Sequence, residues 1–315
     1  MKQLRNIASI DLGTNSCLLL VQGSLLENGA REALHDESNI VRLGQDLGQE
    51  VDQNKQFVPK AMERTLNCLK GYAEVVKKFE INPSDVIAVG TAQARDAVNA
   101  VEFFKKIEET IGFKFQILSE EQEAFATFMG AALPGMDISK MVVIDIGGGS
   151  TEIADAKHGE SLRVGSVKMT ERFFKSDPVT EEEFLRCQSE IDLTLYSVKS
   201  VISNQNTFVA VAGTAVTLAM LHLGMQEYDP KKIDGFTLHQ GDVHRLVEEL
   251  KCKSIAERKL MVGMEDERAD VMLAGGLILS RAMEVLGFHE VIISTKGLRY
   301  GVLTSNFLST FGIIC

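Results

Sequence analysis

Hydrophobic and turn-forming residues follow one another in the same order in the two halves of the chain. In the first half, the apolar runs predict two strands within 4–23 that are joined at Gly13-Thr14-Asn15, followed by strands at 31–43, 85–90 and 114–118. In the second half they predict strands at 141–146, 151–156, 161–166, 208–212 and 290–294. Each half thus has three strands followed by helices and further strands. This repeated order predicts two similar α/β domains.

Apolar residues spaced three and four positions apart predict the helices between these strands. Helices are expected to begin at Pro59, at Ser119 and at Thr180, and others to cover 98–111, 267–286 and 299–311. Ser119-Glu120-Glu121-Gln122 has the form of a capping box, in which the serine hydroxyl and the glutamine side chain satisfy free amides at the helix start. This places Glu123 at the end of the first helical turn.

One short phrase occurs twice, 134 positions apart, as Ile10–Ser16 and Ile144–Ser150. In each copy an apolar strand ends in Asp and is followed by a glycine turn and a hydroxyl residue. A single copy is typical of an ordinary hairpin turn whose aspartate caps the turn. The repetition favours a pair of phosphate-binding turns that face each other, because glycine lets phosphate oxygens approach the backbone amides. The candidate phosphate-binding residues are Gly13, Thr14, Asn15, Ser16, Gly147, Gly148, Gly149 and Ser150.

A second phrase, Gly-Thr-Ala, occurs at 90–92 and again at 213–215, and in both places it follows a predicted strand. Ligand sites of α/β folds lie at such strand ends. Thr91, Gly213 and Thr214 are therefore further phosphate-binding candidates. Arg95 lies four residues beyond Thr91, and Lys296 is a second basic candidate, with Arg268 and Arg299 also available.

The strand-end aspartates Asp11 and Asp145 are candidate ligands of Mg²⁺, which takes one or two carboxylates together with phosphate oxygens and water. Hydrolysis of a phosphoanhydride also needs a base that activates water. Glu123 and Glu152 are the candidates for this catalytic role. Glu152 directly follows the second glycine turn, so it is equally a candidate metal ligand.

Composition limits the classes of function. The net charge of −11 argues against a nucleic-acid-binding surface, so a polyanionic substrate would need a local basic lining. The five cysteines include no C-x-x-C pair, which argues for reduced thiols. The sequence shows no signal-peptide pattern and no apolar run of about 18 residues, and Cys315 is in the wrong position for a prenylation box. We therefore expect a cytoplasmic protein without membrane or nucleic-acid partners.

The chain resembles the exopolyphosphatase and guanosine pentaphosphate phosphohydrolase (Ppx/GppA) family of the actin-like ATPase superfamily. The segments that carry the resemblance are Asp11–Ser16, Gly90-Thr91 with Arg95, Ser119–Ala124, Val143–Glu152, Ala212–Thr214 and Lys296–Gly301. They span nearly the whole chain in the family's order.

The resemblance implies an α/β fold of two ribonuclease H-like domains, each a mixed five-stranded sheet flanked by helices, which close on a central cleft. Domain I is expected over 1–125 and domain II over 126–315, with the helix at 299–311 packing back on domain I and no C-terminal helical extension. The resemblance also implies dependence on Mg²⁺ or another divalent cation. It assigns the general base to Glu123, and Gln122 replaces the glutamate that precedes this base in the family.

The sequence therefore predicts an exopolyphosphatase that releases terminal phosphate from inorganic polyphosphate. A guanosine pentaphosphate phosphohydrolase is the first alternative, and a non-catalytic sensor of nucleotide or polyphosphate is the second. A homodimer is compatible with either activity. A kinase on the same fold is disfavoured, since it would use an aspartate base and the sequence shows no acceptor-sugar signature.

Overall fold

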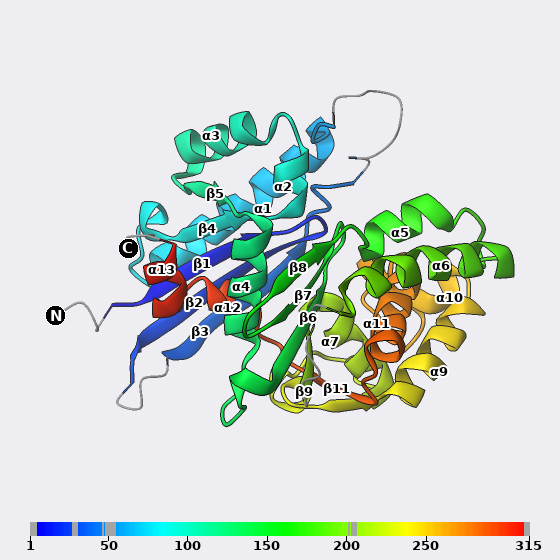
Figure 1. The fold of residues 1–315 in the computed structure, drawn as a ribbon. Coiled ribbons are helices and arrows are strands. Elements are labelled where there is room, and N and C mark those ends of the chain that lie inside the picture. The colour runs from blue at the N-terminus through cyan, green and yellow to red at the C-terminus, as the bar shows by residue number, and fades with distance from the viewer. Residues whose placement is uncertain are drawn as a thin grey trace. The chain divides into compact units, whose positions relative to one another are not determined.

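A computed structural model describes residues 5–26, 31–45, 47, 55–200, 202 and 207–311 (Figure 1). The chain divides into two compact units. Unit 1 contains Met1–Gly130 and Leu298–Cys315, and unit 2 contains Ala131–Gly297. The predicted end of domain I, residue 125, lies inside helix α4 (Glu120–Ala131). Cys315 lies outside the described residues.

The sheet of unit 1 has five strands in the order β3-β2-β1-β4-β5. Antiparallel pairing joins β1 to β2 and β2 to β3, and parallel pairing joins β1 to β4 and β4 to β5. The strands are β1 (Ile7–Leu12), β2 (Ser16–Leu25), β3 (Arg31–Ile40), β4 (Ile87–Gly90) and β5 (Phe115–Ile117).

Helices cover both faces of this sheet. Ile10, Leu12 and Leu19 point to one face and pack in one core cluster with the apolar stripe of α1. Leu20 and Val89 point to the other face and pack with α4 and the C-terminal segment. The helices of unit 1 are α1 (Pro59–Lys78), α2 (Ala92–Asp96), α3 (Ala100–Ile111), α4, α12 (Leu298–Gly301) and α13 (Ser305–Thr310), with a 3-10 turn at Pro83–Asp85.

The sheet of unit 2 repeats this topology. Its order is β8-β7-β6-β9-β11-β10, and the first five strands have the same parallel and antiparallel neighbours as β3-β2-β1-β4-β5. The repetition confirms the predicted fold class of two ribonuclease H-like units. The predicted five strands are wrong for unit 2, because the short strand β10 adds a sixth, antiparallel strand at the edge next to β11. The strands are β6 (Met141–Ile146), β7 (Thr151–Asp155), β8 (Gly159–Leu162), β9 (Thr207–Val211), β10 (Thr237–His239) and β11 (Glu290–Ile293).

One large core cluster joins the sheet of unit 2 to its helices. The central helix α11 is buried along almost its whole length and packs against α5, α6, α7 and α9. The helices are α5 (Ser166–Phe173), α6 (Glu181–Val198), α7 (Ala212–Leu223), α8 (Pro230–Ile233), α9 (Gln240–Lys251), α10 (Ile255–Lys259) and α11 (Met272–Leu286), with 3-10 turns at Ile138–Lys140 and Asp266–Arg268.

Several predicted boundaries move. The third strand of unit 2 ends at Leu162 rather than 166, because α5 begins at Ser166. The helix predicted from 267 begins at Met272, after a 3-10 turn. The segment predicted as one helix over 299–311 forms two short helices, since the helical turn ends at Gly301 and Thr304 caps a new one.

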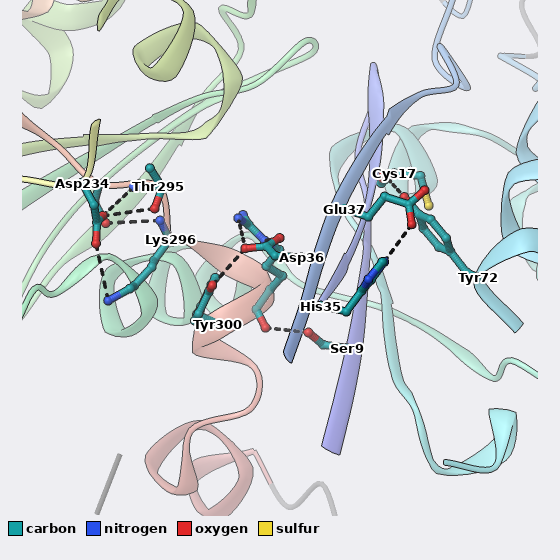
Figure 2. A network of polar contacts seen from close by, with 12 residues as sticks. Ser9, Cys17, His35, Asp36, Glu37, Tyr72, Asp234, Thr295, Lys296 and Tyr300 are labelled. Atoms are coloured by element: carbon teal, nitrogen blue, oxygen red, sulfur yellow. Dashed lines mark hydrogen bonds and ion pairs between the residues drawn. The ribbon is translucent and has the colours of Figure 1, made fainter. Parts of the chain in front are cut away.

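The C-terminal segment is held on unit 1 by polar contacts. The Arg299 guanidinium donates two hydrogen bonds of 2.9 Å to the two carboxylate oxygens of Asp36 on β3. The Tyr300 hydroxyl donates to the same carboxylate, and the Ser9 hydroxyl donates to the Arg299 carbonyl (Figure 2). Among the helices in the described part of the chain, none is long and apolar enough to cross a membrane.

Candidate functional site

The two repeated phrases form turns with the same hydrogen bond. The Gly13 amide donates to the Ser16 carbonyl at 2.8 Å, and the Gly147 amide donates to the Ser150 carbonyl at 3.0 Å. Asp11 and Asp145 are each the last but one residue of the strand that leads into the turn. The sequence repeat is therefore a repeat of local structure.

Each turn is supported by the backbone that follows the third strand in chain order, which is β3 in unit 1 and β8 in unit 2. The Gly44 amide donates to the Thr14 carbonyl at 2.9 Å, and the Lys168 amide donates to the equivalent Gly148 carbonyl at 3.0 Å. The Ser166 amide also donates to the Gly147 carbonyl at 2.9 Å. These bonds turn carbonyl oxygens, which would repel a phosphate, toward the protein.

Gly165 lies directly behind the turn of unit 2. A Cβ atom added there would be 2.5 Å from the Gly148 carbonyl oxygen, a distance that real side chains do not tolerate. We expect Gly165→Ala to displace the turn and to lower phosphate release by about 10- to 100-fold, as misplaced binding groups do. Steady-state kinetics checks this. Gly71→Ala is the matched control, since a Cβ there meets nothing within 4 Å and activity should be unchanged.

Asp145 and Glu152 form a pair of carboxylates in unit 2. They stand directly opposite each other on the antiparallel strands β6 and β7. Opposite residues of this kind share one face of the sheet with Cβ atoms about 4.5–5.5 Å apart. Glu152 is buried, and its Oε1 accepts a hydrogen bond of 2.8 Å from the Ser161 hydroxyl on β8. In unit 1, Leu18 stands opposite Asp11.

This pair fits a divalent cation. Like charges placed directly across two strands destabilise the sheet, and a bound cation would remove that repulsion. Carboxylate oxygens are the ligands that Mg²⁺ prefers, and one or two suffice where phosphate and water complete the shell. In the described parts of the chain, no group of three or more His, Cys, Asp or Glu side chains is arranged to hold a metal ion. A site here would therefore rely on substrate oxygens.

Glu123 and Arg95 are brought together in unit 1. Arg95 Nη1 lies 2.5 Å from Glu123 Oε2 and also donates to the Leu118 carbonyl at 3.0 Å. The side chain of Glu123 is only 9% exposed, so the guanidinium supplies the opposite charge that a buried carboxylate needs. Its helix begins as predicted, with Ser119 and Gln122 bonded reciprocally. Gln122 thus has a structural role.

Polar side chains near Thr91 and Thr214 hold the ends of the central strands. The Thr91 hydroxyl donates to Gln93, whose side-chain amide donates to the carbonyl of Leu12. In unit 2 the Thr214 hydroxyl lies 3.4 Å from the carbonyl of Ile146, the equivalent residue. Both contacts fix the residue between the aspartate and the glycine turn.

The two Gly-Thr phrases do not occupy equivalent positions. Strand pairing places Val89 beside Asp11 and Val211 beside Asp145, so Val211 corresponds to Val89 and Gly213 to Thr91. Gly213 and Thr214 follow strand β9 as predicted, but they lie in the first turn of α7 and not in a glycine turn. Ala212, the first residue of α7, adopts φ of 65°, a left-handed conformation that is unfavourable for alanine.

Two basic side chains of unit 2 have defined partners. The guanidinium of Arg268 lies over Gly213, where an added Cβ would be 2.0 Å from its Nη1, and its Nε donates to Glu265. The ammonium of Lys296 lies 3.6 Å from the carboxylate of Asp234 (Figure 2). Arg268 therefore brings positive charge to the start of a helix, where anions bind.

The structure places the predicted site residues in both units. Unit 1 holds Asp11, Gly13, Thr14, Asn15, Ser16, Thr91, Arg95 and Glu123. Unit 2 holds Asp145, Gly147, Gly148, Gly149, Ser150, Glu152, Gly213, Thr214 and Lys296. The residues that sequence reasoning missed are Gln93, Ser161 and Gly165. Gln93 follows Thr91 by two positions and could have been found from that spacing. Ser161 required the strand pairing, and Gly165 required the contact of its backbone with Gly148.

The chain is similar over most of its length to proteins of one known family. Residues 26–310 match the model of the Ppx/GppA phosphatase family. Exopolyphosphatase 2 of Mycobacterium tuberculosis is 31% identical over 320 residues, which cover 96% of this chain and 98% of that protein.

Two further relatives have similar identity. The bifunctional 3-dehydroquinate synthase/phosphatase of Fusobacterium nucleatum is 30% identical over 310 residues, which cover 94% of this chain and 46% of that protein. The chain thus spans about half the length of that relative. Among solved structures, the Aquifex aeolicus PPX-GPPA enzyme superposes with a TM-score of 0.78 at 31% identity, over 95% of this chain and 98% of that one.

Proposed function

Because this chain belongs to the Ppx/GppA phosphatase family, we propose that it is an exopolyphosphatase that releases terminal phosphate from inorganic polyphosphate in the cytoplasm. The chain is a phosphohydrolase by its family, and two of its relatives are named exopolyphosphatases or putative exopolyphosphatases. The cytoplasmic location is supported by the cysteine pattern, since Cys17, Cys68, Cys187 and Cys252 are free thiols.

The observation that carries the proposal is the carboxylate pair Asp145 and Glu152, which flanks the glycine turn at 147–150. A turn whose carbonyls are bonded to the protein presents its amide side to an anion. Carboxylates on the adjoining strands then supply the ligands for a cation that accompanies phosphate. One strand–turn–strand unit thus combines backbone amides that can bind phosphate oxygens with carboxylates that can bind the accompanying cation.

In the proposed mechanism, Asp145 and Glu152 would hold Mg²⁺ in unit 2, and Asp11 is the candidate metal ligand of unit 1. When bound, Mg²⁺ neutralises charge on the phosphate oxygens. The turns at 13–16 and 147–150, together with the start of α7 under Arg268, donate hydrogen bonds to phosphate oxygens.

Glu123 is proposed as the general base. Its carboxylate accepts a proton from the attacking water, while Arg95 fixes its position through the 2.5 Å contact. Glu152 is the weaker candidate for this role, because it already accepts a hydrogen bond from Ser161 and stands opposite Asp145. We therefore assign Glu152 to the metal.

A parallel assay of phosphate release tests the function. The substrates are long polyphosphate, short polyphosphate, guanosine pentaphosphate and ATP, each with Mg²⁺ and with EDTA. We expect release from polyphosphate to be the fastest by about tenfold or more, since one more phosphate contact of about 1.4 kcal/mol changes a rate by that factor, and to stop in EDTA. Faster release from guanosine pentaphosphate would select the nucleotide activity, and tight binding without turnover would select the sensor.

A further inference from the structure

Two cysteines of unit 1 lie side by side between a strand and a helix. Cys17 is the second residue of β2, and Cys68 lies in the middle of α1, which packs on β2. Both are free thiols, and a hydrogen bond joins their side chains. Cysteines this far apart in the sequence meet only because the strand and the helix share one core. The contact is therefore a property of the fold.

The two thiols differ in burial and in acidity. Cys17 is fully buried, and this burial, together with the hydrogen bond to Cys68, raises the pKa of the Cys17 thiol well above its ordinary value. Cys68 is half-buried, and the hydrogen bond with Cys17 lowers the pKa of the Cys68 thiol. The proton is thus held on Cys17, and Cys68 has the greater thiolate character. Because the thiolate is the reactive form, an oxidant reacts with Cys68 first.

A polar network fixes the backbone around this pair (Figure 2). Tyr72, one helical turn after Cys68, donates a hydrogen bond of 2.7 Å from its hydroxyl to the Cys17 carbonyl. The side-chain amide of Asn39 on β3 donates to the Tyr72 hydroxyl at 3.1 Å and to the Glu37 carboxylate at 2.8 Å. These bonds hold α1 against β2 at this point, so the two sulfur atoms stay adjacent.

Packing alone accounts for Cys17 but not for the pair. A buried cysteine commonly serves as a small apolar side chain, and Cys17 lies among the core residues of unit 1. That role does not explain a second, partly exposed thiol in hydrogen-bond contact with the first. An accessible thiol of lowered pKa beside a resolving cysteine is the arrangement of redox-sensitive cysteines. In a reducing compartment, the disulfides of such pairs are transient.

We propose that Cys17 and Cys68 form a reversible disulfide on reaction with hydrogen peroxide, and that this bond displaces the turn at 13–16. The Cys68 sulfur attacks one peroxide oxygen, the O–O bond breaks, and the leaving hydroxide takes the proton that Cys68 released. The products are a sulfenic acid on Cys68 and water. The Cys17 sulfur then attacks the Cys68 sulfur, the S–O bond breaks, and the hydroxide leaves as water with the Cys17 proton. Two thiols lose two electrons, and one peroxide becomes two waters.

The new bond acts on the turn through the backbone of Cys17. Cys17 directly follows Ser16, whose carbonyl accepts the 2.8 Å hydrogen bond from the Gly13 amide that closes the turn. Cys17 also pairs with Leu12, the residue before the turn. A covalent bond holds two sulfur atoms closer than a hydrogen bond does, so oxidation draws Cys17 toward α1 and Ser16 with it. The hydrogen bond that closes the turn is then weakened.

Peptide mapping of the full chain tests the bond. The folded protein is treated with hydrogen peroxide and its remaining thiols are alkylated. The digest should contain a peptide pair that links Cys17 to Cys68 and that separates in dithiothreitol. Cys68→Ala should remove this linked pair, and Cys17→Ala should leave a sulfenic acid on Cys68 that dimedone traps. Cys252→Ala is the matched control, since it deletes an exposed thiol elsewhere and should keep the linked pair.

Hydrogen exchange tests the effect on the turn. The Gly13 amide should exchange about 3- to 10-fold faster in the oxidised parent, since a hydrogen bond of ordinary strength is weakened, and should recover in dithiothreitol. Cys68 that is still alkylated after peroxide treatment overturns the proposal, and so does a disulfide that leaves this exchange unchanged.

Phosphate release should fall by about tenfold or more on oxidation and recover in dithiothreitol, because misplaced binding groups slow a reaction. This consequence rests on the proposed function, whereas the linked peptides and the exchange rate do not depend on it. A linked pair with faster exchange but unchanged release would confirm the disulfide and contradict the role of the turn in phosphate binding.

Discussion

Glu123→Gln is expected to abolish phosphate release, with kcat lowered by about 10²- to 10⁴-fold, the usual contribution of a general base. Glutamine has the size of glutamate and can still accept a hydrogen bond from Arg95, but it cannot take a proton from water. Steady-state release of phosphate from polyphosphate measures kcat, and equilibrium binding measures affinity. Affinity should stay within about threefold of the parent, since the base acts mainly in the transition state.

The control for this variant is Glu121→Gln, a charge change in the first turn of the same helix. Glu121 is exposed, whereas Glu123 is buried against Arg95. Both substitutions remove one negative charge near the helix start, where acids stabilise by about 0.3–1 kcal/mol. Glu123→Gln in addition removes the candidate base and the ion pair with Arg95. If the two variants turn over polyphosphate at similar rates, Glu123 serves to hold Arg95 and the base lies elsewhere.

The parts of the site that sequence could predict are those formed by neighbouring residues. The turns at 13–16 and 147–150 depend on a strand-end aspartate and glycine within one short phrase, and the helix start at Ser119 depends on a capping box. Such features are local in sequence and in space. The order of strands along the chain also follows from local signals, because apolar runs and turn residues occur in the same order in both halves.

The features that sequence could not predict depend on contacts between distant segments. Gly165 matters because its backbone touches Gly148, and nothing in the surrounding residues indicates that approach. Helices α7 and α9 and strand β10 were not predicted. Helix α7 is apolar nearly all round, so its pattern has no stripe of period 3.6, as expected of a buried helix.

The Gly-Thr repeat shows how a true motif can suggest a wrong equivalence. The residues match at an offset of 123, but strand pairing sets the offset at 122, from Val89 to Val211. One residue more stands between Val211 and Gly213 than between Val89 and Gly90, and this extra residue, Ala212, adopts a left-handed conformation. The sequence shows which residues are identical in the two units. The hydrogen-bond register of the strands decides which residues occupy equivalent positions in the two sheets.

Asp145→Asn is expected to remove the dependence on Mg²⁺ in stability as well as in turnover. A ligand that binds only the folded state stabilises it by about 2.7 kcal/mol at a hundred times its Kd. This corresponds to a rise in Tm of about 5–10 °C, at about 2–4 °C per kcal/mol for a domain of 150–250 residues. Scanning calorimetry with EDTA and with saturating Mg²⁺ should show this rise in the parent and lose it in Asp145→Asn. Phosphate release should fall by about 100-fold or more, the size of effect expected when a charge clamp on phosphate is removed.

The size of the effect in EDTA distinguishes a metal site from a structural carboxylate. Without metal, Asp145 stands opposite Glu152, so neutralising it removes a repulsion between like charges, which should offset up to about 1 kcal/mol of any stability lost with the carboxylate. Asp155→Ala, on the same strand as Glu152, is the control. Asp155 accepts amide hydrogen bonds of 2.8 Å from Lys157 and His158, so its loss should lower stability by about 0.5–2 kcal/mol in both buffers and preserve the response to Mg²⁺. An Asp145→Asn variant that behaves like Asp155→Ala would show that Asp145 supports the fold and that the cation is bound by other residues.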